Sequence, residues 1–330
     1  MKVIIPVAGA GTKLRPFTYT QPKPLIPVAG KPILSYILDQ LIASGQNDFI
    51  FVVGYLADKI IEFLDQYYPH IKKEYIIQKE RQGLGHAIYG CKEIIDEDEE
   101  VIIQLGDSIL DLDLKVLTRC KHNTLAVRKV QDPRSFGVVE LDENGFIKKL
   151  VEKPIIPKSN LALVGLYYIK EFHQLVQALE YNIENDIRTK GEFHLTDGLM
   201  RLLELGYRFE VMEVKNWFDC GKKEVLLETN AIMLDRAPQE NFPIQTENCI
   251  IIPPVRIGIN CKIKNSIIGP HASIGESTEI DNSIIKEAII GNFSLLDSIV
   301  MQHSIIGNDV IIKGRSQTYN VGDNTELDVL

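Results

Sequence analysis

The strongest constraint on how this chain can fold is a repeat in its last 85 residues. Isoleucine–glycine pairs recur there at intervals of 17, 16 and 16 residues, at Ile257-Gly258, Ile274-Gly275, Ile290-Gly291 and Ile306-Gly307. Isoleucines between the pairs bring the apolar spacing to five or six residues, three to each coil. Such a coil buries its apolar side chains only by stacking on its neighbours. The repeat therefore predicts a three-sided parallel β-helix over residues 246–330.

The first third of the chain has a different pattern, in which strands alternate with helices. Short apolar runs at 2–8, 48–53 and 100–105 are typical of buried strands, and apolar residues have helical spacing in 33–43 and 84–95. This alternation is typical of parallel sheets with helices on both faces. We predict an α/β domain with a Rossmann-like, mainly parallel mixed sheet. Its ligands are expected at the carboxyl ends of the strands.

A loop with two prolines, residues 236–246, separates the two patterns. We predict a first domain at residues 1–235, a linker at 236–245 and the repeat domain at 246–330. Two domains agree with the length of 330 residues.

The composition argues against several classes of protein. A net charge of −9 argues against a general affinity for nucleic acid or for an anionic membrane. The 5 cysteines form no Cys-x-x-Cys pair, which argues against a disulfide framework or a zinc site. No apolar run approaches the roughly 18 residues of a membrane span, and the N-terminus is typical of a strand, not of a signal peptide. A cytoplasmic location is expected by default.

A glycine-rich loop with several cations follows the first strand. It reads Gly9-Ala10-Gly11-Thr12-Lys13-Leu14-Arg15-Pro16, and Pro22-Lys23-Pro24-Leu25 and Lys31-Pro32 come after it. Two glycines let the backbone approach a ligand and expose successive N–H groups, which favours an anion site. The spacing matches neither the Walker A loop nor the dinucleotide fingerprint. A triphosphate suits the three cations Lys13, Arg15 and Lys23.

The whole run resembles the nucleotide-binding loop of the sugar-1-phosphate nucleotidylyltransferases, Gly-x-Gly-Thr-Arg-Leu-x-Pro followed by Pro-Lys-Pro-Leu and Lys-Pro. The resemblance implies a nucleotide-diphospho-sugar transferase fold, with a nucleoside triphosphate and a sugar 1-phosphate as substrates. It implies that Lys13, Arg15 and Lys23 act on the phosphates. It also implies that the nucleotide lies on Ala8, Gly9, Gly11 and Thr12. The family usually has arginine at the position of Lys13. Lysine keeps the positive charge but cannot donate two hydrogen bonds from one planar group, as arginine does to a phosphate.

Two aspartates are candidates for a metal site. Asp107 follows the apolar run 100–105 and is expected to face the glycine-rich loop. Alone it is equally well explained as a turn residue. The resemblance implies that Asp107 and Asp219, in Trp217-Phe218-Asp219-Cys220-Gly221, hold Mg²⁺. Magnesium typically takes one or two carboxylates together with phosphate oxygens.

The segment from Gln78 to Ala87 carries the expected base-reading residues. The resemblance assigns this role to Gln78 and Gly83, and the run Gly-Leu-Gly-His-Ala is most similar to glucose-1-phosphate uridylyltransferases. Thymidylyltransferases share its Gly-Leu. A glutamine amide pairs with the imide edge of uracil or thymine equally well, so UTP and dTTP both stay open. His86 is expected to begin a helix without a catalytic role.

The middle third predicts a hairpin, with strands at 136–142 and 146–151 joined by an Asn-Gly turn. Glu152 and Lys153 follow and would otherwise be a surface ion pair. The resemblance implies that Lys153 binds the sugar's phosphate. It also implies that Glu152 and the Gly137 backbone contact its hydroxyls, and that Gly165 leaves room for the ligand. The segment from Lys190 to Asp197 also matches the family, without an assigned role.

The repeat resembles the left-handed hexapeptide-repeat domain of acyltransferases and of some long nucleotidylyltransferases. We predict a structural role for the repeat. We also predict a homo-oligomer, because the unpaired strand edges at the open ends of the coils favour covering by another surface. Its histidines, His271 and His303, are expected at solvated corners. Two other functions stay open: a non-catalytic, nucleotide-sugar-binding regulatory subunit, and a bifunctional enzyme with sugar-phosphate acetyltransferase activity in the repeat.

Overall fold

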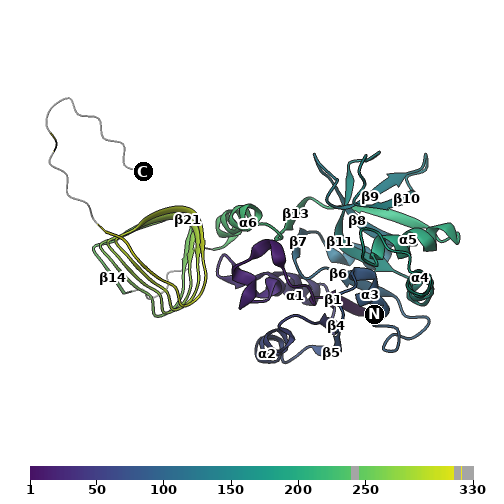
Figure 1. Ribbon diagram of the computed structural model, residues 1–330, viewed down its shortest axis with the longest axis horizontal. Helices are drawn as coiled ribbons and strands as arrows, with labels where there is room; N and C mark the ends of the chain where they lie inside the picture. The colour runs from purple at the N-terminus through teal and green to yellow at the C-terminus, as the bar shows by residue number, and fades with distance from the viewer. Residues whose placement is uncertain (239–244, 316–320, 322–330) are drawn as a thin grey trace. The chain divides into compact units, whose positions relative to one another are not determined.

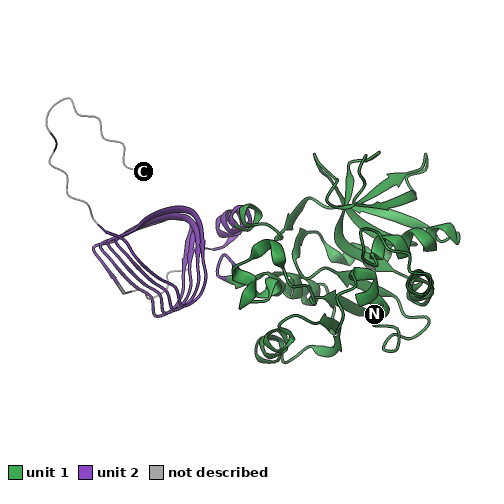
Figure 2. Ribbon diagram, in the orientation of Figure 1, with its two compact units in different colours: residues 1–26, 31–226 green, residues 27–30, 227–330 purple. Residues whose placement is uncertain are grey.

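The computed structural model describes residues 1–238, 245–315 and 321 (Figure 1). These residues form two compact units (Figure 2). The first unit comprises 1–26 and 31–226, and the second comprises 27–30 and 227–330. The division falls inside helix α6 (Lys223–Arg236). The domain limits at 235 and 246 stay a prediction, and residues 239–244 and most of the last fifteen lie outside the described residues.

A nine-stranded mixed sheet forms the first unit (Figure 1). Strands β6, β1, β4 and β5 are parallel neighbours, whereas β11 is antiparallel to β6, β8 and β9. The Rossmann-like mixed sheet is confirmed: β6, β1, β4 and β5 form its parallel part, and among the described strands beyond β11 only β12 runs parallel to its partner, β8. The strands are β1 (Lys2–Pro6), β4 (Asp48–Val53), β5 (Lys72–Ile77), β6 (Val101–Gln104), β8 (Asn123–Lys129), β9 (Gly137–Leu141), β10 (Ile147–Glu152), β11 (Leu161–Ile169) and β12 (Phe209–Glu213).

Helices pack beside this sheet. The α-helices of the first unit, α6 aside, are α1 (Ile33–Ala43), α2 (Ala57–Tyr67), α3 (Leu84–Tyr89), α4 (Phe172–Glu184) and α5 (Leu195–Glu204). The 3₁₀ helices are η1 (Thr12–Leu14), η2 (Phe17–Tyr19), η3 (Lys23–Leu25) and η4 (Leu114–Arg119). Helix α3 is shorter than its apolar spacing predicts. Gly90 is a weak helix former, and after it tighter bonds such as Cys91 N–H to the Ile88 carbonyl replace the α-helical pattern. None of the described helices could cross a bilayer.

The central strand β1 sets the position of the site. Val3, Ile4 and Ile5 are fully buried between β4 and β6. A continuous apolar run is what a strand covered on both faces requires. The polar residues that follow β1 and β6 therefore emerge next to each other at one edge of the sheet.

Besides the main sheet there are two small two-stranded sheets, β7 with β13 and β2 with β3. Strands β7 (Ser108–Asp111) and β13 (Asn216–Asp219) pair antiparallel. Strands β2 (Pro27–Val28) and β3 (Lys31–Pro32) pair directly after the nucleotide loop. The β9–β10 hairpin has the Asn-Gly turn that the sequence predicts. Asp142 Oδ1 accepts hydrogen bonds from two backbone N–H groups of that turn, at 2.8 and 2.9 Å.

The second unit consists of stacked parallel strands (Figure 1). Each isoleucine of the repeat pairs with its equivalent in the next coil: Ile257 with Ile274, and Ile274 with Ile290, which in turn aligns with Ile306. This register is that of a parallel β-helix, and its handedness stays a prediction. The strands are β14 (Gln245–Glu247), β15 (Ile250–Ile251), β16 (Val255–Ile257), β17 (Lys262–Lys264), β18 (Ile267–Ile268), β19 (Ala272–Ile274), β20 (Glu279–Asp281), β21 (Ile284–Ile290), β22 (Leu295–Asp297), β23 (Val300–Ile306) and β24 (Ile311–Lys313).

Neighbouring isoleucines of β21 provide a matched test of this stacking. Ile285 is fully buried, whereas Ile284 is 40% exposed. Ile285→Ala should cost about 2–4 kcal/mol of stability, because it removes buried methyl groups and leaves a cavity. Ile284→Ala should cost less than about 1 kcal/mol. Denaturant unfolding followed by circular dichroism measures both, and equal losses would contradict the assigned faces.

Candidate active site

The glycine-rich loop turns sharply where β1 ends. Gly11 has a φ of 59°, and a Cβ built on it would lie 2.9 Å from Thr18 Cγ2 and 3.1 Å from Lys23 Cβ. Thr18 donates a hydrogen bond to the Gly11 carbonyl at 2.9 Å, and Leu14 is fully buried below. Only glycine fits this close approach. The turn therefore folds the chain back and brings Lys23 under the loop.

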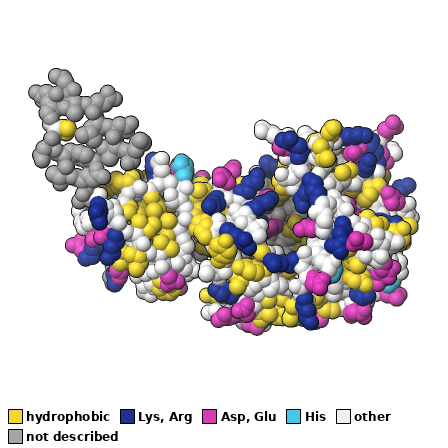
Figure 3. Space-filling model, in the orientation of Figure 1, with side chains coloured by type: hydrophobic (Ala, Val, Ile, Leu, Met, Phe, Trp, Pro, Cys, Tyr) yellow, Lys and Arg dark blue, Asp and Glu magenta, His cyan; other side chains and the backbone are white. Residues whose placement is uncertain are grey.

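The upper surface of the loop is open. A Cβ built on Gly9 would meet no atom within 4 Å, so a ligand can approach this backbone. Ala8 below it is buried, and Thr12, Lys13 and Arg15 are exposed. The visible face of the first unit is hollowed, and lysine and arginine side chains gather around the hollow (Figure 3). The loop can thus present both N–H groups and positive charge to an anion.

Lys23 forms the charged centre of the site. Its ammonium group pairs with Asp107 Oδ2, and the lysine side chain is only 13% exposed. Burial acts to lower the pKa of Lys23, but the neighbouring charges of Asp107 and Asp219 outweigh it and raise the pKa. Lys23 therefore stays protonated. This ion pair joins Asp107 to the segment Pro22-Lys23-Pro24-Leu25 that follows the glycine-rich loop, and the prediction that Asp107 faces the loop itself stays a prediction.

The pairing of β7 with β13 brings the two aspartates together. Asp219 lies opposite Ser108, and the Cys220 N–H donates to the Asp107 carbonyl at 3.1 Å. A Cβ on Gly221 would lie 3.0 Å from Asp219 Oδ1 and 3.3 Å from Lys23 Nζ, so the two side chains converge over this glycine. Both aspartates therefore lie beside the Lys23 ammonium group.

The two carboxylates fit a hard divalent cation. Burial, and after it the charge of Asp107, raises the pKa of Asp219 above the usual range. A dication between the two would relieve that repulsion. Among the described residues no group of three or more histidine, cysteine and acidic side chains could hold a metal by itself. Mg²⁺ typically takes one or two carboxylates and completes its shell with phosphate oxygens and water, so two aspartates would suffice to hold it.

The segment after β5 contains Gln78 and Gly83, the residues that are predicted to read the base. Gln78 Nε2 donates to the Gly83 carbonyl at 3.2 Å and lies 3.3 Å from His86 Nδ1. Gly83 has a φ of 110°, and a Cβ there would lie 2.5 Å from the Phe193 carbonyl. Close packing against Phe193 therefore leaves no room for a side chain at position 83. The contact of Gly83 with a base stays a prediction.

Three of the residues that are predicted to contact the sugar phosphate, Gly137, Glu152 and Lys153, meet around the Glu152 carboxylate. Glu152 pairs with Gly137 across the β9–β10 hairpin, and a Cβ on Gly137 would lie 3.1 Å from Glu152 Oε2. Thr196 Oγ1 donates to the same oxygen at 2.7 Å. Lys153 Nζ lies 3.3 Å and His194 Nδ1 3.4 Å from Glu152 Oε1. Lys153 is held with a φ of 44°, a conformation that non-glycine residues rarely adopt.

Sequence reasoning did not assign His194 or Thr196 a role. Both are buried and hold the Glu152 carboxylate. The sequence signal that pointed to these two residues was the match of residues 190–197 to the family. That match indicated the segment but not the contacts that its residues make. Gly165 was predicted to leave room for the ligand, but a Cβ there would lie 2.8 Å from the Leu105 side chain. Packing alone therefore requires glycine at this position. Its contact with sugar stays a prediction.

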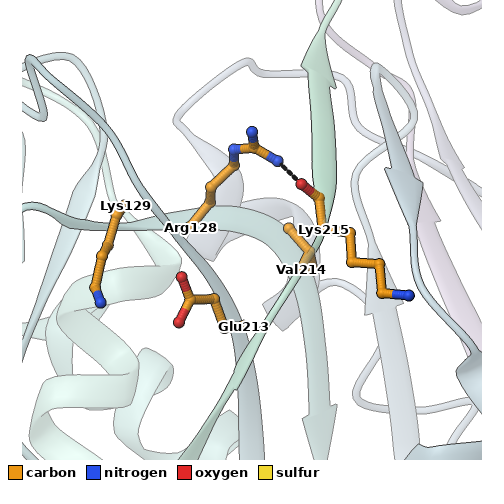
Figure 4. A pocket seen from close by; sticks show the side chains of 5 residues that line it. All are labelled: Arg128, Lys129, Glu213, Val214 and Lys215. Atoms are coloured by element: carbon orange, nitrogen blue, oxygen red, sulfur yellow. Dashed lines mark hydrogen bonds between the residues drawn. The ribbon is translucent and has the colours of Figure 1, made fainter.

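An open pocket of about 360 Å³ lies elsewhere on the first unit (Figure 4). Arg128 at the end of β8 donates to the Lys215 carbonyl there. The residues that line the pocket are Arg128, Lys129, Glu213, Val214 and Lys215. None of the residues that the sequence singled out lines this pocket, so it adds nothing to the site described above.

Similarity to known proteins agrees with this geometry. A Haloferax volcanii protein named low-salt glycan biosynthesis nucleotidyltransferase Agl11 is 33% identical over 71% of this chain and 66% of its own length. A Methanocaldococcus jannaschii protein named bifunctional protein GlmU is 35% identical over 76% of this chain and 59% of its own. The chain therefore spans less than two thirds of these relatives. A glucose-1-phosphate thymidylyltransferase of Streptomyces griseus is 32% identical over 81% of this chain and 75% of its own.

Solved structures share the fold. A Bacillus anthracis structure described as a glucose-1-phosphate thymidylyltransferase in complex with sucrose has a TM-score of 0.62 at 26% identity, over 73% of this chain and 97% of its own. A UDP-glucose pyrophosphorylase bound to UDP-glucose also has a TM-score of 0.62, at 24% identity, over 72% of this chain and 99% of its own. The family profile described as nucleotidyl transferase matches residues 2–236. The glycine-rich loop, the paired aspartates and this match together show that the chain belongs to the nucleotidyl transferase family.

Proposed function

We propose that this protein transfers a nucleotidyl group from a nucleoside triphosphate to a sugar 1-phosphate. The products are a nucleotide-sugar and pyrophosphate. The observation that carries the proposal is Lys23 beside Asp107 and Asp219, directly beneath the open glycine-rich loop. The relatives named as glucose-1-phosphate thymidylyltransferases support a glucose 1-phosphate-like acceptor.

The reaction needs no general base. An oxygen of the sugar phosphate is already anionic at neutral pH. It attacks the α-phosphorus in line, the bond to the α–β bridging oxygen breaks, and pyrophosphate leaves with that electron pair. The main barrier is to bring two polyanions together and to stabilise the charge in transit. We assign Lys13 and Arg15 to the leaving pyrophosphate, Lys23 to the α-phosphate and Lys153 to the incoming phosphate.

We propose that Asp107 and Asp219 bind magnesium when the triphosphate is present. The bound ion would neutralise part of the triphosphate's charge. Lys23 is then expected to exchange its contact with Asp107 for a phosphate oxygen. Because its pKa is raised, Lys23 carries its full charge throughout the physiological range.

Asp107→Asn and Asp219→Asn should each lower magnesium-dependent pyrophosphate release by about a hundredfold or more. Each change removes a charged group that faces the phosphates. A coupled pyrophosphate assay at saturating substrates measures the loss. A variant with near-normal release would remove that aspartate from the metal site.

The same variants should change the stability of the metal-free protein in opposite directions. The raised pKa of Asp219 means that the folded state binds its proton more tightly than the unfolded state. That contribution is present at low pH and is lost as the pH rises through the raised pKa. Asp219→Asn should therefore raise the melting temperature at neutral pH. Asp107→Asn leaves Lys23 without its nearest counter-charge and should cost about 1–3 kcal/mol.

Thermal unfolding in a chelator distinguishes these effects. The gain from Asp219→Asn should shrink at mildly acidic pH, where the wild-type carboxyl group is itself protonated. Equal destabilisation by both substitutions at neutral pH would show that the electrostatic assignment of Asp219 is wrong.

UTP or dTTP should be used in preference to ATP or GTP, because the Gln78 amide can pair with the imide edge of a pyrimidine. A matrix of triphosphates against sugar 1-phosphates, read by pyrophosphate release, measures this preference. A purine preference would overturn the base assignment and leave the reaction class intact.

Lys13→Arg in the same assay should keep or improve turnover.

The second unit is proposed to be structural and to favour a homo-oligomer, and the cytoplasmic location stays a prediction. His271 and His303 have positive φ angles of 58° and 48°, as corner residues do. Each lies 3.0 Å from a carboxylate, Asp235 for His271 and Glu287 for His303. His303 is 67% exposed and agrees with a solvated corner, whereas His271 is only 27% exposed. The proposed function does not include acetyl transfer.

A further inference from the structure

A buried histidine lies beside the Glu152 carboxylate and has no part in the chemistry proposed above. His194 is 7% exposed, and its Nδ1 atom lies 3.4 Å from Glu152 Oε1. The Glu152 side chain is itself only 10% exposed. A carboxylate with so little access to water is unfavourable unless neighbouring groups stabilise its charge. His194 lies close enough to be one of those groups.

The backbone around His194 is held by the start of helix α3. The Gly85 N–H donates to the Phe193 carbonyl at 2.7 Å, and the Phe193 N–H donates to the Gln82 carbonyl at 2.8 Å. A Cβ built on Gly85 would lie 2.9 Å from the His194 carbonyl oxygen. The imidazole ring therefore extends from a fixed backbone and can turn only about its own side-chain bonds.

The surroundings of the ring decide which nitrogen carries the proton. An ionised carboxylate only accepts hydrogen bonds, so Nδ1 must carry a proton to interact favourably with Glu152. Within the described part of the chain, the buried Nε2 atom has no hydrogen-bond partner. Glu192 Oε2 lies 3.9 Å from Nε2, which is beyond hydrogen-bond distance. The neutral ring is therefore expected in its Nδ1–H form.

The carboxylate needs a partner at each oxygen to be fixed in its plane. Thr196 bonds to Oε2 alone, which leaves the carboxylate free to turn about that contact. At Oε1 the second neighbour is Lys153, whose side chain is 35% exposed and is assigned above to the incoming phosphate. Once Lys153 turns to the phosphate, His194 is the described group that stays at Oε1.

We propose that His194 is a positioning residue for Glu152 and thereby sets the selectivity for the sugar. It holds Oε1 through Nδ1 while Thr196 holds Oε2, so the remaining lone pairs of the carboxylate keep fixed directions for the sugar hydroxyls. The inference rests on the proposed function, because it takes Glu152 to contact those hydroxyls.

Two substitutions of His194 distinguish positioning from packing. In His194→Asn the side-chain amide can place an N–H near the position of Nδ1, whereas His194→Leu fills more of the volume and has no donor. His194→Leu should raise the KM for glucose 1-phosphate by about 10- to 100-fold, since small displacements of a positioning group have effects of this size. His194→Asn should stay close to the wild type. A packing role predicts the reverse order, and that order, or equal KM values, would overturn the proposal.

Met200→Leu is the matched control on helix α5. Met200 Sδ accepts a hydrogen bond from the Leu150 N–H of β10 at 3.3 Å, so this substitution changes the contact between α5 and β10 without removing a partner of the carboxylate. Its KM for glucose 1-phosphate should match the wild type. A rise equal to that of His194→Leu would assign the effect to the helix contact and overturn the proposal.

Selectivity is measured with monodeoxy analogues of glucose 1-phosphate, each of which lacks one ring hydroxyl. The wild type should use at least one analogue less efficiently than glucose 1-phosphate. In His194→Leu the ratio of the two kcat/KM values should fall toward one, because a carboxylate that can turn distinguishes the hydroxyl less well. An unchanged ratio would contradict the role of His194 in selectivity.

Nitrogen-15 NMR of the wild-type protein with labelled histidine tests the same role without the reaction. The signals of His194 are those that disappear in His194→Asn, and at mildly alkaline pH they should show a proton on Nδ1. A proton on Nε2 alone would overturn the proposal, even if His194→Leu fails to fold. If the wild type releases no pyrophosphate with any sugar 1-phosphate, the proposed function fails, while the position of this proton still decides whether His194 holds Glu152.

Discussion

The site depends on one interaction, the ion pair between Lys23 and Asp107 with Asp219 beside it. Three charged groups share a partly buried space, and burial alone would make each of them unfavourable. Two carboxylates and one ammonium group leave a local excess of negative charge, and burial, followed by the charge of Asp107, raises the pKa of Asp219. A cation that joined this centre would neutralise that excess charge. On the proposed function, a triphosphate that arrives with magnesium would supply the cation and would also offer Lys23 a new partner.

The strand order of the fold brings these groups together. Parallel strands β1 and β6 end at the same edge, so the glycine-rich loop and Asp107 emerge as neighbours. Asp219 comes from more than a hundred residues later and reaches them through the pairing of β13 with β7. The sugar-side carboxylate, Glu152, is held by a separate hairpin and by Thr196. On the proposed function, two substrates that repel each other would bind to separate regions of this sheet.

Features that repeat or lie close in sequence could be predicted from the sequence. The isoleucine spacing gives the stacking register, and the loop residues give the phosphate-binding region. Contacts between distant residues could not be predicted: Thr196 meets Glu152 across 44 positions, and Asn230 meets Ala29 across 201. Packing also decides residues for which the sequence suggested ligand contact, since Gly83 and Gly165 each face a close neighbour. Such constraints depend on tertiary structure, and local patterns do not contain them.

The most direct test of the central claim is ³¹P NMR of the intact protein with magnesium, UTP or dTTP, and glucose 1-phosphate. The proposed reaction replaces the sugar phosphate signal by the paired signals of a nucleotide-sugar diphosphate, together with pyrophosphate in equal amount. Binding of the nucleotide without any change in the phosphate signals would contradict the account and would favour a regulatory, non-catalytic protein. Release of inorganic phosphate instead of pyrophosphate would contradict the assigned bond cleavage.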